Sequence, residues 1–111
     1  MDKKLKNAIN DQIKNELYSG YLYLSMAAYF EARNLAGFGH WMKVQAKEEQ
    51  GHAMKMFNFL VDRGVQVVLQ AIPQPPADFS SPQAVFEQTL EHEKKVTALI
   101  EKLCDLSEET D

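Results

Sequence analysis

The positions of the prolines constrain this chain more than any other feature of its sequence. All 4 prolines lie between positions 73 and 82. Elsewhere few residues interrupt a helix, and from about Leu5 to Arg33 the only Gly or Pro is Gly20. Glycine and proline are the residues that an α-helix tolerates least. Their distribution therefore predicts an all-α fold of long helices with one irregular connection.

Three helices are expected around this connection. The second covers residues 38–64 and ends at Gly64, a residue suited to the left-handed conformation that closes a helix. Ser81 and Pro82 are typical of the N-cap and first position of a helix, and they predict a third helix over residues 82–106. The first, over residues 4–33, has apolar residues at helical spacing: Leu5, Ile9, Ile13, Leu17 and Leu24. Because only a short loop separates the first two helices, they should form an antiparallel hairpin.

Residues 65–81 form a connection that is long for two neighbouring helices. The second helix should be roughly 40 Å long at 1.5 Å per residue. An extended connection of this length can reach about 55 Å. We therefore expect residues 65–81 to run back along the whole bundle, which would place the third helix parallel to the second.

Composition and charge exclude several classes of protein. The formal net charge is −4, which argues against a nucleic-acid partner and against an anionic membrane surface. The most apolar early run, residues 21–30, is too short to span a bilayer, and the charged N-terminus does not resemble a signal peptide. The single cysteine, Cys104, excludes an internal disulfide and suits a reducing compartment. We expect one cytoplasmic domain over residues 1–111, with no nucleic-acid and no membrane partner.

Each predicted helix carries a glutamate on its apolar face. Residues seven apart on a helix nearly overlie one another, and Glu16, Glu49 and Glu93 all have apolar residues at both of these positions. His52 follows Glu49 by about one turn on the same helix. Buried carboxylates are costly and repel one another, so a bound cation is the simplest explanation for three of them in one core. Carboxylates with one imidazole suit iron, manganese or zinc.

Each of these residues also has a plainer explanation when it is taken alone. A glutamate at a predicted core position often lies at the edge of the apolar face and is solvated. A single Glu-x-x-His match is common by chance, and Tyr23 could simply be a core residue. His40 and His92 are expected at the surface. Equivalent placement of a glutamate on three consecutive helices is what favours a metal site.

The ligand set is incomplete when it is compared with a four-helix di-metal site. Such a site takes a single Glu from each of two helices and a Glu-x-x-His pair from each of the other two. Glu16 and Glu93 fill the single-Glu roles, and Glu49 with His52 fills one pair. No histidine follows His92, so the sequence holds no second pair. We expect the fourth helix to be missing from this chain.

Three segments resemble the prokaryotic non-haem ferritins: residues 15–23 (Asn-Glu-Leu-Tyr-Ser-Gly-Tyr-Leu-Tyr), residues 46–53 (Ala-Lys-Glu-Glu-Gln-Gly-His-Ala) and the pair His92-Glu93. The similarity covers essentially the whole chain, including the connection. It implies a ferritin-like antiparallel helical bundle with a long crossover, of which this chain has the first three helices.

The resemblance also implies roles for individual residues. Glu16, Glu49 and His52 would form the first iron site, and Glu49 would bridge to a second iron that Glu93 also binds. Tyr23 would lie beside this di-iron centre, and Glu48 would contribute to a third iron site. Gln50 stands where the haem-containing bacterioferritins have their haem-ligating methionine, so no haem is expected.

The implied function is iron storage. Two Fe(II) ions would be oxidised by dioxygen or peroxide, and the ferric product would enter a mineral inside a homo-oligomeric shell of 24 subunits. One alternative is a truncated or nicked fragment that assembles through an exposed apolar groove without ferroxidase turnover. Another is that a second chain supplies the missing fourth helix.

Overall fold

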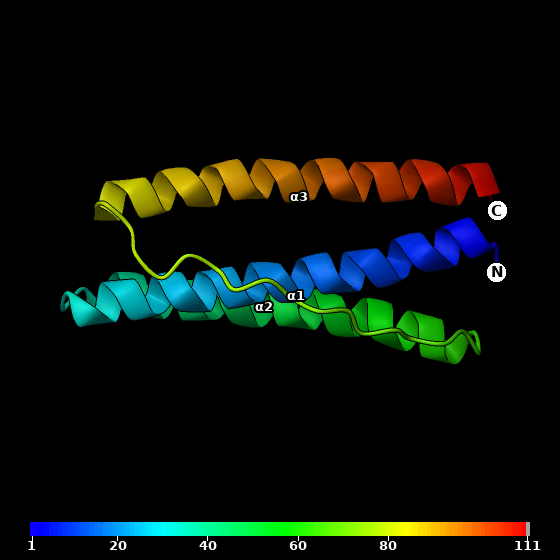
Figure 1. Cartoon of the computed structure of the whole chain (residues 1–111), viewed down its shortest axis with the longest axis horizontal. Coiled ribbons are helices and arrows are strands. Elements are labelled where there is room, and N and C mark those ends of the chain that lie inside the picture. The colour runs from blue at the N-terminus through cyan, green and yellow to red at the C-terminus, as the bar shows by residue number, and fades with distance from the viewer. Residues whose placement is uncertain (111) are drawn as a thin grey trace.

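The computed structural model describes residues 1–110, which form three α-helices and no strand. These are α1 (Lys3–Ala32), α2 (Ala36–Asp62) and α3 (Pro82–Thr110). The helices run along the long axis of a molecule with principal-axis extents of 48 × 22 × 21 Å (Figure 1). The expected all-α fold is confirmed, and α3 extends four residues beyond the predicted end at 106.

The α1–α2 hairpin depends on local backbone chemistry at its ends. Asp2 caps α1, because its Oδ1 accepts hydrogen bonds from the backbone N–H groups of Lys4 and Leu5 at 2.8 and 3.3 Å. Asn34 makes the turn in the left-handed region, with φ of 59°. The loop between the first two helices is shorter than the predicted helix bounds of 33 and 38 imply, since α2 already begins at Ala36. Gly64 has φ of 69° just after α2.

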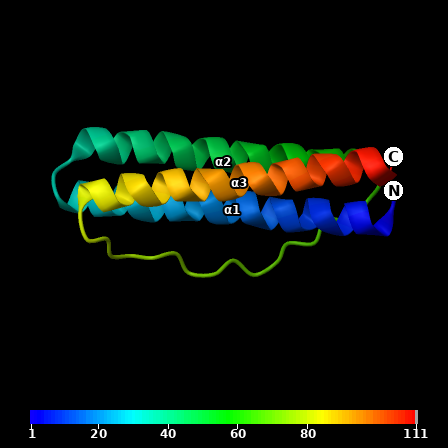
Figure 2. The same ribbon diagram turned by 90° about the horizontal axis from the view of Figure 1, so that it is seen from above.

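The connection between α2 and α3 runs back along the outside of the bundle (Figure 2). It lies against α1 and is bonded to it at both ends. Near its start, Asn10 donates to the Gln66 carbonyl at 3.3 Å and accepts from the Val68 N–H at 2.8 Å. Near its end, the Ser25 hydroxyl donates to the Pro76 carbonyl at 2.6 Å. The crossover therefore returns the chain to the other end, and α3 runs parallel to α2, as predicted (Figure 1).

α1 is the central helix of the three. It packs against α2 and, less extensively, against α3, whereas the Cα atoms of α2 and α3 do not approach within 8 Å in the described residues. Side chains of α1 occur in both apolar clusters, one around Tyr23 and Phe30 and the other around Ile13 and Leu60. Leu24, which has helical spacing with the core residues, is instead 49% exposed. The backbones of α2 and α3 thus stay apart along one side of the molecule.

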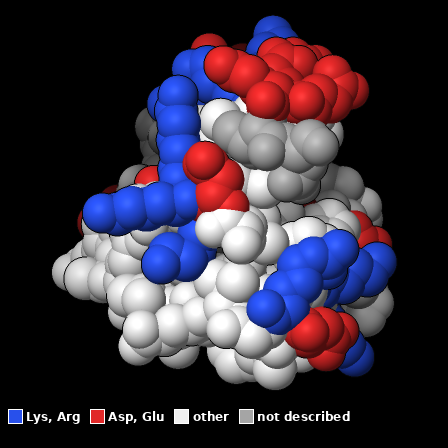
Figure 3. Space-filling view, turned by 90° about the vertical axis from the view of Figure 1, so that its right-hand side faces the viewer, with Lys and Arg blue, Asp and Glu red and all other residues white. Residues whose placement is uncertain are grey.

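The end of the molecule that holds both termini carries charges of both signs (Figure 3). None of the described helices combines the length and apolar character that a membrane span requires. In Figure 3, acidic side chains gather at the top of this end, and Lys and Arg side chains lie beside and below them.

Candidate metal centre

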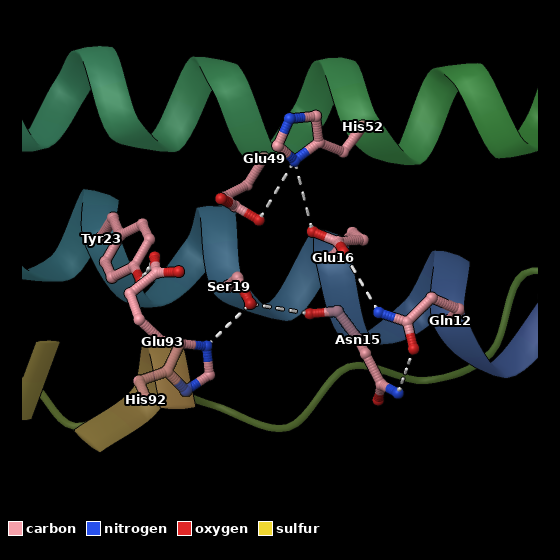
Figure 4. Close-up of polar contacts among 9 residues, drawn as sticks. All are labelled: Gln12, Asn15, Glu16, Ser19, Tyr23, Glu49, His52, His92 and Glu93. Atoms are coloured by element: carbon pink, nitrogen blue, oxygen red, sulfur yellow. Dashed lines mark hydrogen bonds and ion pairs between the residues drawn. The ribbon is translucent and has the colours of Figure 1, made fainter. Parts of the chain in front are cut away.

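Two buried glutamates face each other where α1 and α2 pack together. Glu16 on α1 is 1% exposed and Glu49 on α2 is 6% exposed. Gly20 allows the two helices to come this close, because a Cβ at that position would lie 3.1 Å from the Ala46 carbonyl oxygen and 3.7 Å from the Glu49 Cβ. On the other side, the Gln12 amide donates to Glu16 Oε1 at 3.1 Å and fixes that carboxylate (Figure 4).

His52 directs a ring nitrogen at both carboxylates. Its Nδ1 lies 3.8 Å from Glu16 Oε2 and 3.7 Å from Glu49 Oε2 (Figure 4). These distances are too long for hydrogen bonds. One donor atom from each of the three residues lies within 4.8 Å of the others. The side chain of His52 is half exposed, so this group is reached from the surface of α2.

The buried carboxylate oxygens have no protein partner. Glu16 Oε2 and Glu49 Oε2 are shielded from solvent and form no hydrogen bond. Among residues 1–110, no Lys or Arg forms an ion pair with Glu16, Glu49 or Glu93. Buried polar atoms are nearly always satisfied, and an unpaired one destabilises the fold. Two such oxygens beside an imidazole nitrogen fit a divalent cation, since all three are donors that such ions accept.

Burial has a direct effect on the charge of this pair. Burial is the largest cause that raises the pKa of Glu49 from 4.5 to about 8, and the charge of the neighbouring Glu16 carboxylate is a further cause. The negative charges of Glu93 and Glu48 add smaller contributions to the same pKa. Without a cation, Glu49 therefore holds a proton near neutral pH, and a bound metal would replace it.

Tyr23 and Glu93 form a second pair beside the first. The ring of Tyr23 is fully buried in α1, and its hydroxyl donates to Glu93 Oε1 on α3 (Figure 4). Burial, the hydrogen bond to Glu93 and the nearby carboxylates all raise the pKa of Tyr23 above its usual range. Glu93 is half-buried and stands outside the cluster of three donors.

The remaining predicted residues have different surroundings. Glu48 is exposed on α2 and does not join the cluster, and His40 is exposed as expected. His92 is not a surface residue, which corrects the expectation from sequence. It is half-buried, its Nε2 lies 2.7 Å from the Ser19 hydroxyl, and burial lowers its pKa.

The sequence reading missed Gln12 and Ser19, both buried polar residues of α1. Their spacing carried a signal, since Gln12 precedes Glu16 by four residues and Ser19 precedes Tyr23 by four. Residues four apart lie on one helical face. Polar residues at these positions therefore face the same interior as Glu16.

Comparison with known proteins connects this site to one family. The ferritin family model, described as a ferritin-like domain, matches residues 6–111. The bacterial non-heme ferritin of Bacteroides fragilis (strain 638R) is 43% identical over 107 residues, which are 96% of this chain and 67% of the relative. That of Staphylococcus aureus (strain USA300) is 35% identical over 107 residues, which are 96% of this chain and 64% of the relative.

A solved structure gives the same result. The open pore ferritin from the archaeon Archaeoglobus fulgidus superposes with a TM-score of 0.95 at 48% sequence identity, covering 98% of this chain and 66% of that chain. The chain thus spans about two thirds of the length of the proteins it matches. With a family match over nearly all of its residues and relatives above 40% identity, the chain belongs to the ferritin family.

Proposed function

We propose that this chain takes part in iron storage, binding Fe(II) at Glu16, Glu49 and His52 and oxidising it to Fe(III). One observation carries the proposal: two buried carboxylate oxygens without a partner lie close to the imidazole nitrogen of His52. A metal ion would satisfy both oxygens at once and would compensate their charge.

A second iron would lie between Glu49 and Glu93. Glu49 would bridge the two ions, as the resemblance implies, because it lies beside Glu16 and His52 in the group of three donors. The Tyr23 hydroxyl would hold Glu93 in place from the other side. Glu48 would serve a third iron, with further ligands from the part of a ferritin that extends beyond the matched two thirds.

The surrounding carboxylates favour the oxidised product, because a ferric ion gains more from nearby negative charge than a ferrous ion does. Oxidation of two Fe(II) ions releases two electrons, which reduce dioxygen to hydrogen peroxide or hydrogen peroxide to water, with two protons consumed in each case. His52 would provide an imidazole nitrogen to the iron. Glu49, whose pKa is raised in the metal-free protein, would give up its proton when iron binds.

The same proposal extends to assembly and location. The ferric product would enter a mineral inside a homo-oligomeric shell. The resemblance to prokaryotic non-haem ferritins implies 24 subunits in this shell. We propose a centre without haem, because Gln50 stands after Glu48 and Glu49, where the haem-containing bacterioferritins have their haem-ligating methionine. The cytoplasmic location expected from sequence stays a prediction.

Stopped-flow oxidation of Fe(II) under oxygen tests the site in the full-length protein. We expect Glu49→Ala to slow the fast phase strongly, because it removes a ligand shared by both ions. His52→Ala should weaken binding of the first ion. Glu101→Gln is the matched control, since Glu101 is an exposed acid of α3, and it should oxidise iron at the rate of the unchanged protein. Fast oxidation that survives Glu49→Ala would show that the site is wrongly assigned.

One observation favours a second candidate, association without turnover. An open apolar hollow of about 640 Å³ lies at the turn between α1 and α2, and it is lined in part by Phe38, Trp41 and Phe86. The 111-residue chain alone could associate through this surface. Native mass spectrometry combined with the oxidation assay separates the two functions: an assembly that oxidises iron no faster than buffer supports this candidate.

A further inference from the structure

Two polar contacts join α1 and α3 at the level of the site. Ser19 contacts His92, and Tyr23 bonds Glu93 (Figure 4). Ser19 and Tyr23 are one turn apart on α1, whereas His92 and Glu93 are consecutive on α3. His92, which directly precedes the proposed iron ligand Glu93, therefore has a contact of its own with α1.

The contact between Ser19 and His92 has a defined direction. The Ser19 hydroxyl is fully buried and donates its single hydrogen to the Asn15 carbonyl at 3.0 Å. Because that hydrogen is used at Asn15, we infer that Ser19 accepts from His92, whose Nε2 lies 2.7 Å away. This assigns the neutral His92 ring to the tautomer that carries its hydrogen on Nε2.

The His92 ring also lies between two tyrosines of α1. Its centroid is 5.8 Å from that of Tyr23 at an interplanar angle of 88°, and 6.0 Å from that of Tyr18 at 59°. The edge-to-face arrangement with Tyr23 is a favourable one for aromatic rings. His92 thus supports the phenol ring whose hydroxyl bonds Glu93.

Val85, Thr89 and Val96 bury one face of α3 against the core on either side of the site, and His92 continues that face at the level of the site. The α3 backbone approaches α1 but not α2 in the described residues, and Leu90 is 61% exposed on its open side. Successive side chains on a helix point about 100° apart. If α3 turned about its axis, Glu93 would swing away from Glu49. The contact at His92 opposes this turn at the level of Glu93.

We propose that His92 is a positioning residue: through Ser19 and Tyr23 it fixes the rotation of α3 and thereby presents Glu93 to the second metal ion. This inference rests on the proposed function, in which Glu93 binds that ion. It predicts a selective effect. Loss of His92 should weaken the second site and leave the first, formed by Glu16, Glu49 and His52, unchanged.

Calorimetric titration of the full-length, metal-free protein with Co(II) tests this, with visible absorption reporting the ligand geometry at each step. His92→Leu should weaken the second Co(II) site about 10-fold or more, as is typical when a group that orients a ligand is lost. His92→Gln should retain most of the affinity, because a side-chain amide N–H can still donate to Ser19. Ser19→Ala should weaken the second site in the same direction by a smaller factor. His40→Leu, at an exposed histidine of α2, is the matched control and should change neither site.

The Co(II) titration distinguishes failure of the positioning role from failure of the proposed function. If the unchanged protein binds two Co(II) ions and His92→Leu binds both as tightly as His40→Leu does, the positioning role is wrong. If both sites weaken together and His92→Gln does not rescue them, His92 has only a structural role and the inference also fails. If Glu16→Gln and Glu49→Gln leave both sites intact, the proposed function itself fails. Should His92→Leu not fold, Ser19→Ala still tests the inference, because it removes a single oxygen.

A second readout is independent of metal. Long-range proton–nitrogen spectra of the imidazoles should show His92 as the Nε2–H tautomer in the unchanged protein. Ser19→Ala should shift this signal toward a tautomer mixture. A ring that carries its hydrogen on Nδ1 in the unchanged protein would overturn the proposed direction of the bond.

Discussion

Gly20 on α1 lies directly against the backbone of Ala46 on α2, and a Cβ at position 20 would come within 3.1 Å of the Ala46 carbonyl oxygen. The same Cβ would lie 3.7 Å from the Cβ of Glu49. A backbone oxygen cannot move aside as a side chain can. The absence of a side chain at Gly20 therefore sets how closely α1 and α2 approach, and with it the separation of Glu16 and Glu49.

This contact predicts opposite results for alanine at two helical glycines. In an open helix interior, Gly→Ala stabilises a protein by about 1 kcal/mol. Gly51→Ala should show this gain, because no atom lies within 4 Å of a Cβ there. Gly20→Ala should lack this gain, because its Cβ would clash with the Ala46 carbonyl oxygen. In urea unfolding of the metal-free protein, its free energy of unfolding should be at least about 1 kcal/mol lower than that of Gly51→Ala. Equal free energies of unfolding for the two variants would show that the helices adjust freely at Gly20.

The main lines of the fold could be predicted from sequence because they depend on local signals. The Pro-rich segment, the Gly64 turn and the Ser81-Pro82 start mark where helices cannot continue or should begin, and simple lengths then require the crossover. α2 begins two residues before the predicted start at residue 38, because Gly37 lies within the helix. Gly39 is helical and packs against α1, where a Cβ would lie 2.8 Å from the Glu31 Cγ. Such close packing between helices leaves no local signal.

The site could be predicted only in part for the same reason. Helical spacing indicates that Glu16, Glu49 and His52 face inward, and the structure brings their donor atoms together. Spacing does not show how far α3 is rotated about its own axis. The sequence reading therefore placed His92 at the surface, whereas the rotation that turns Glu93 toward Tyr23 also turns His92 toward Ser19.

The raised pKa of Glu49 predicts how the stability of the metal-free protein depends on pH. In the unfolded chain this carboxyl titrates near 4.5, whereas in the folded protein its pKa is about 8. Between these values the folded state binds more protons than the unfolded state, so stability should fall as pH rises from 4.5 to about 8. Above that range the contribution of Glu49 is fully lost.

Glu49→Gln should flatten this dependence, because the amide stays neutral throughout. Urea unfolding in the presence of a chelator, repeated across this pH range, measures the effect. Glu101→Gln removes an exposed acid and should keep the slope of the unchanged protein. A slope that persists in Glu49→Gln would assign it to another group.

Tyr23 should not ionise while the protein is folded. Its pKa is raised by burial, by its hydrogen bond to Glu93 and by the nearby carboxylates. In a spectrophotometric alkaline titration, Tyr23→Phe should therefore leave the absorbance change of the folded protein unaltered. A loss of amplitude in Tyr23→Phe before unfolding would contradict the buried, hydrogen-bonded state.

Metal ions should stabilise the fold through the two unpaired oxygens. An ion that binds only the folded state adds about 2.7 kcal/mol when it is present at about 100 times its Kd. Co(II) or Zn(II) should raise the Tm of the unchanged protein, and a chelator should reverse the rise. His52→Ala should reduce the gain and Glu16→Gln should reduce it further, since Glu16 Oε2 is fully buried. An equal rise in all three proteins would place the stabilising ion elsewhere.

Asn10 should hold the crossover on α1 through bonds to the backbone, whereas the exposed Asp11 bonds the Gln70 side chain. Asn10 is 5% exposed, and its amide both donates to the Gln66 carbonyl and accepts from the Val68 N–H. Asn10→Ala loses both bonds, so we expect destabilisation of about 1 kcal/mol for each. Asn7→Ala, at an exposed position of the same helix, should stay within about 0.5 kcal/mol of the unchanged protein. Hydrogen exchange locates the effect: the Val68 amide should exchange faster in Asn10→Ala alone, whereas equal exchange in both variants would mean that Asn10 does not anchor the crossover.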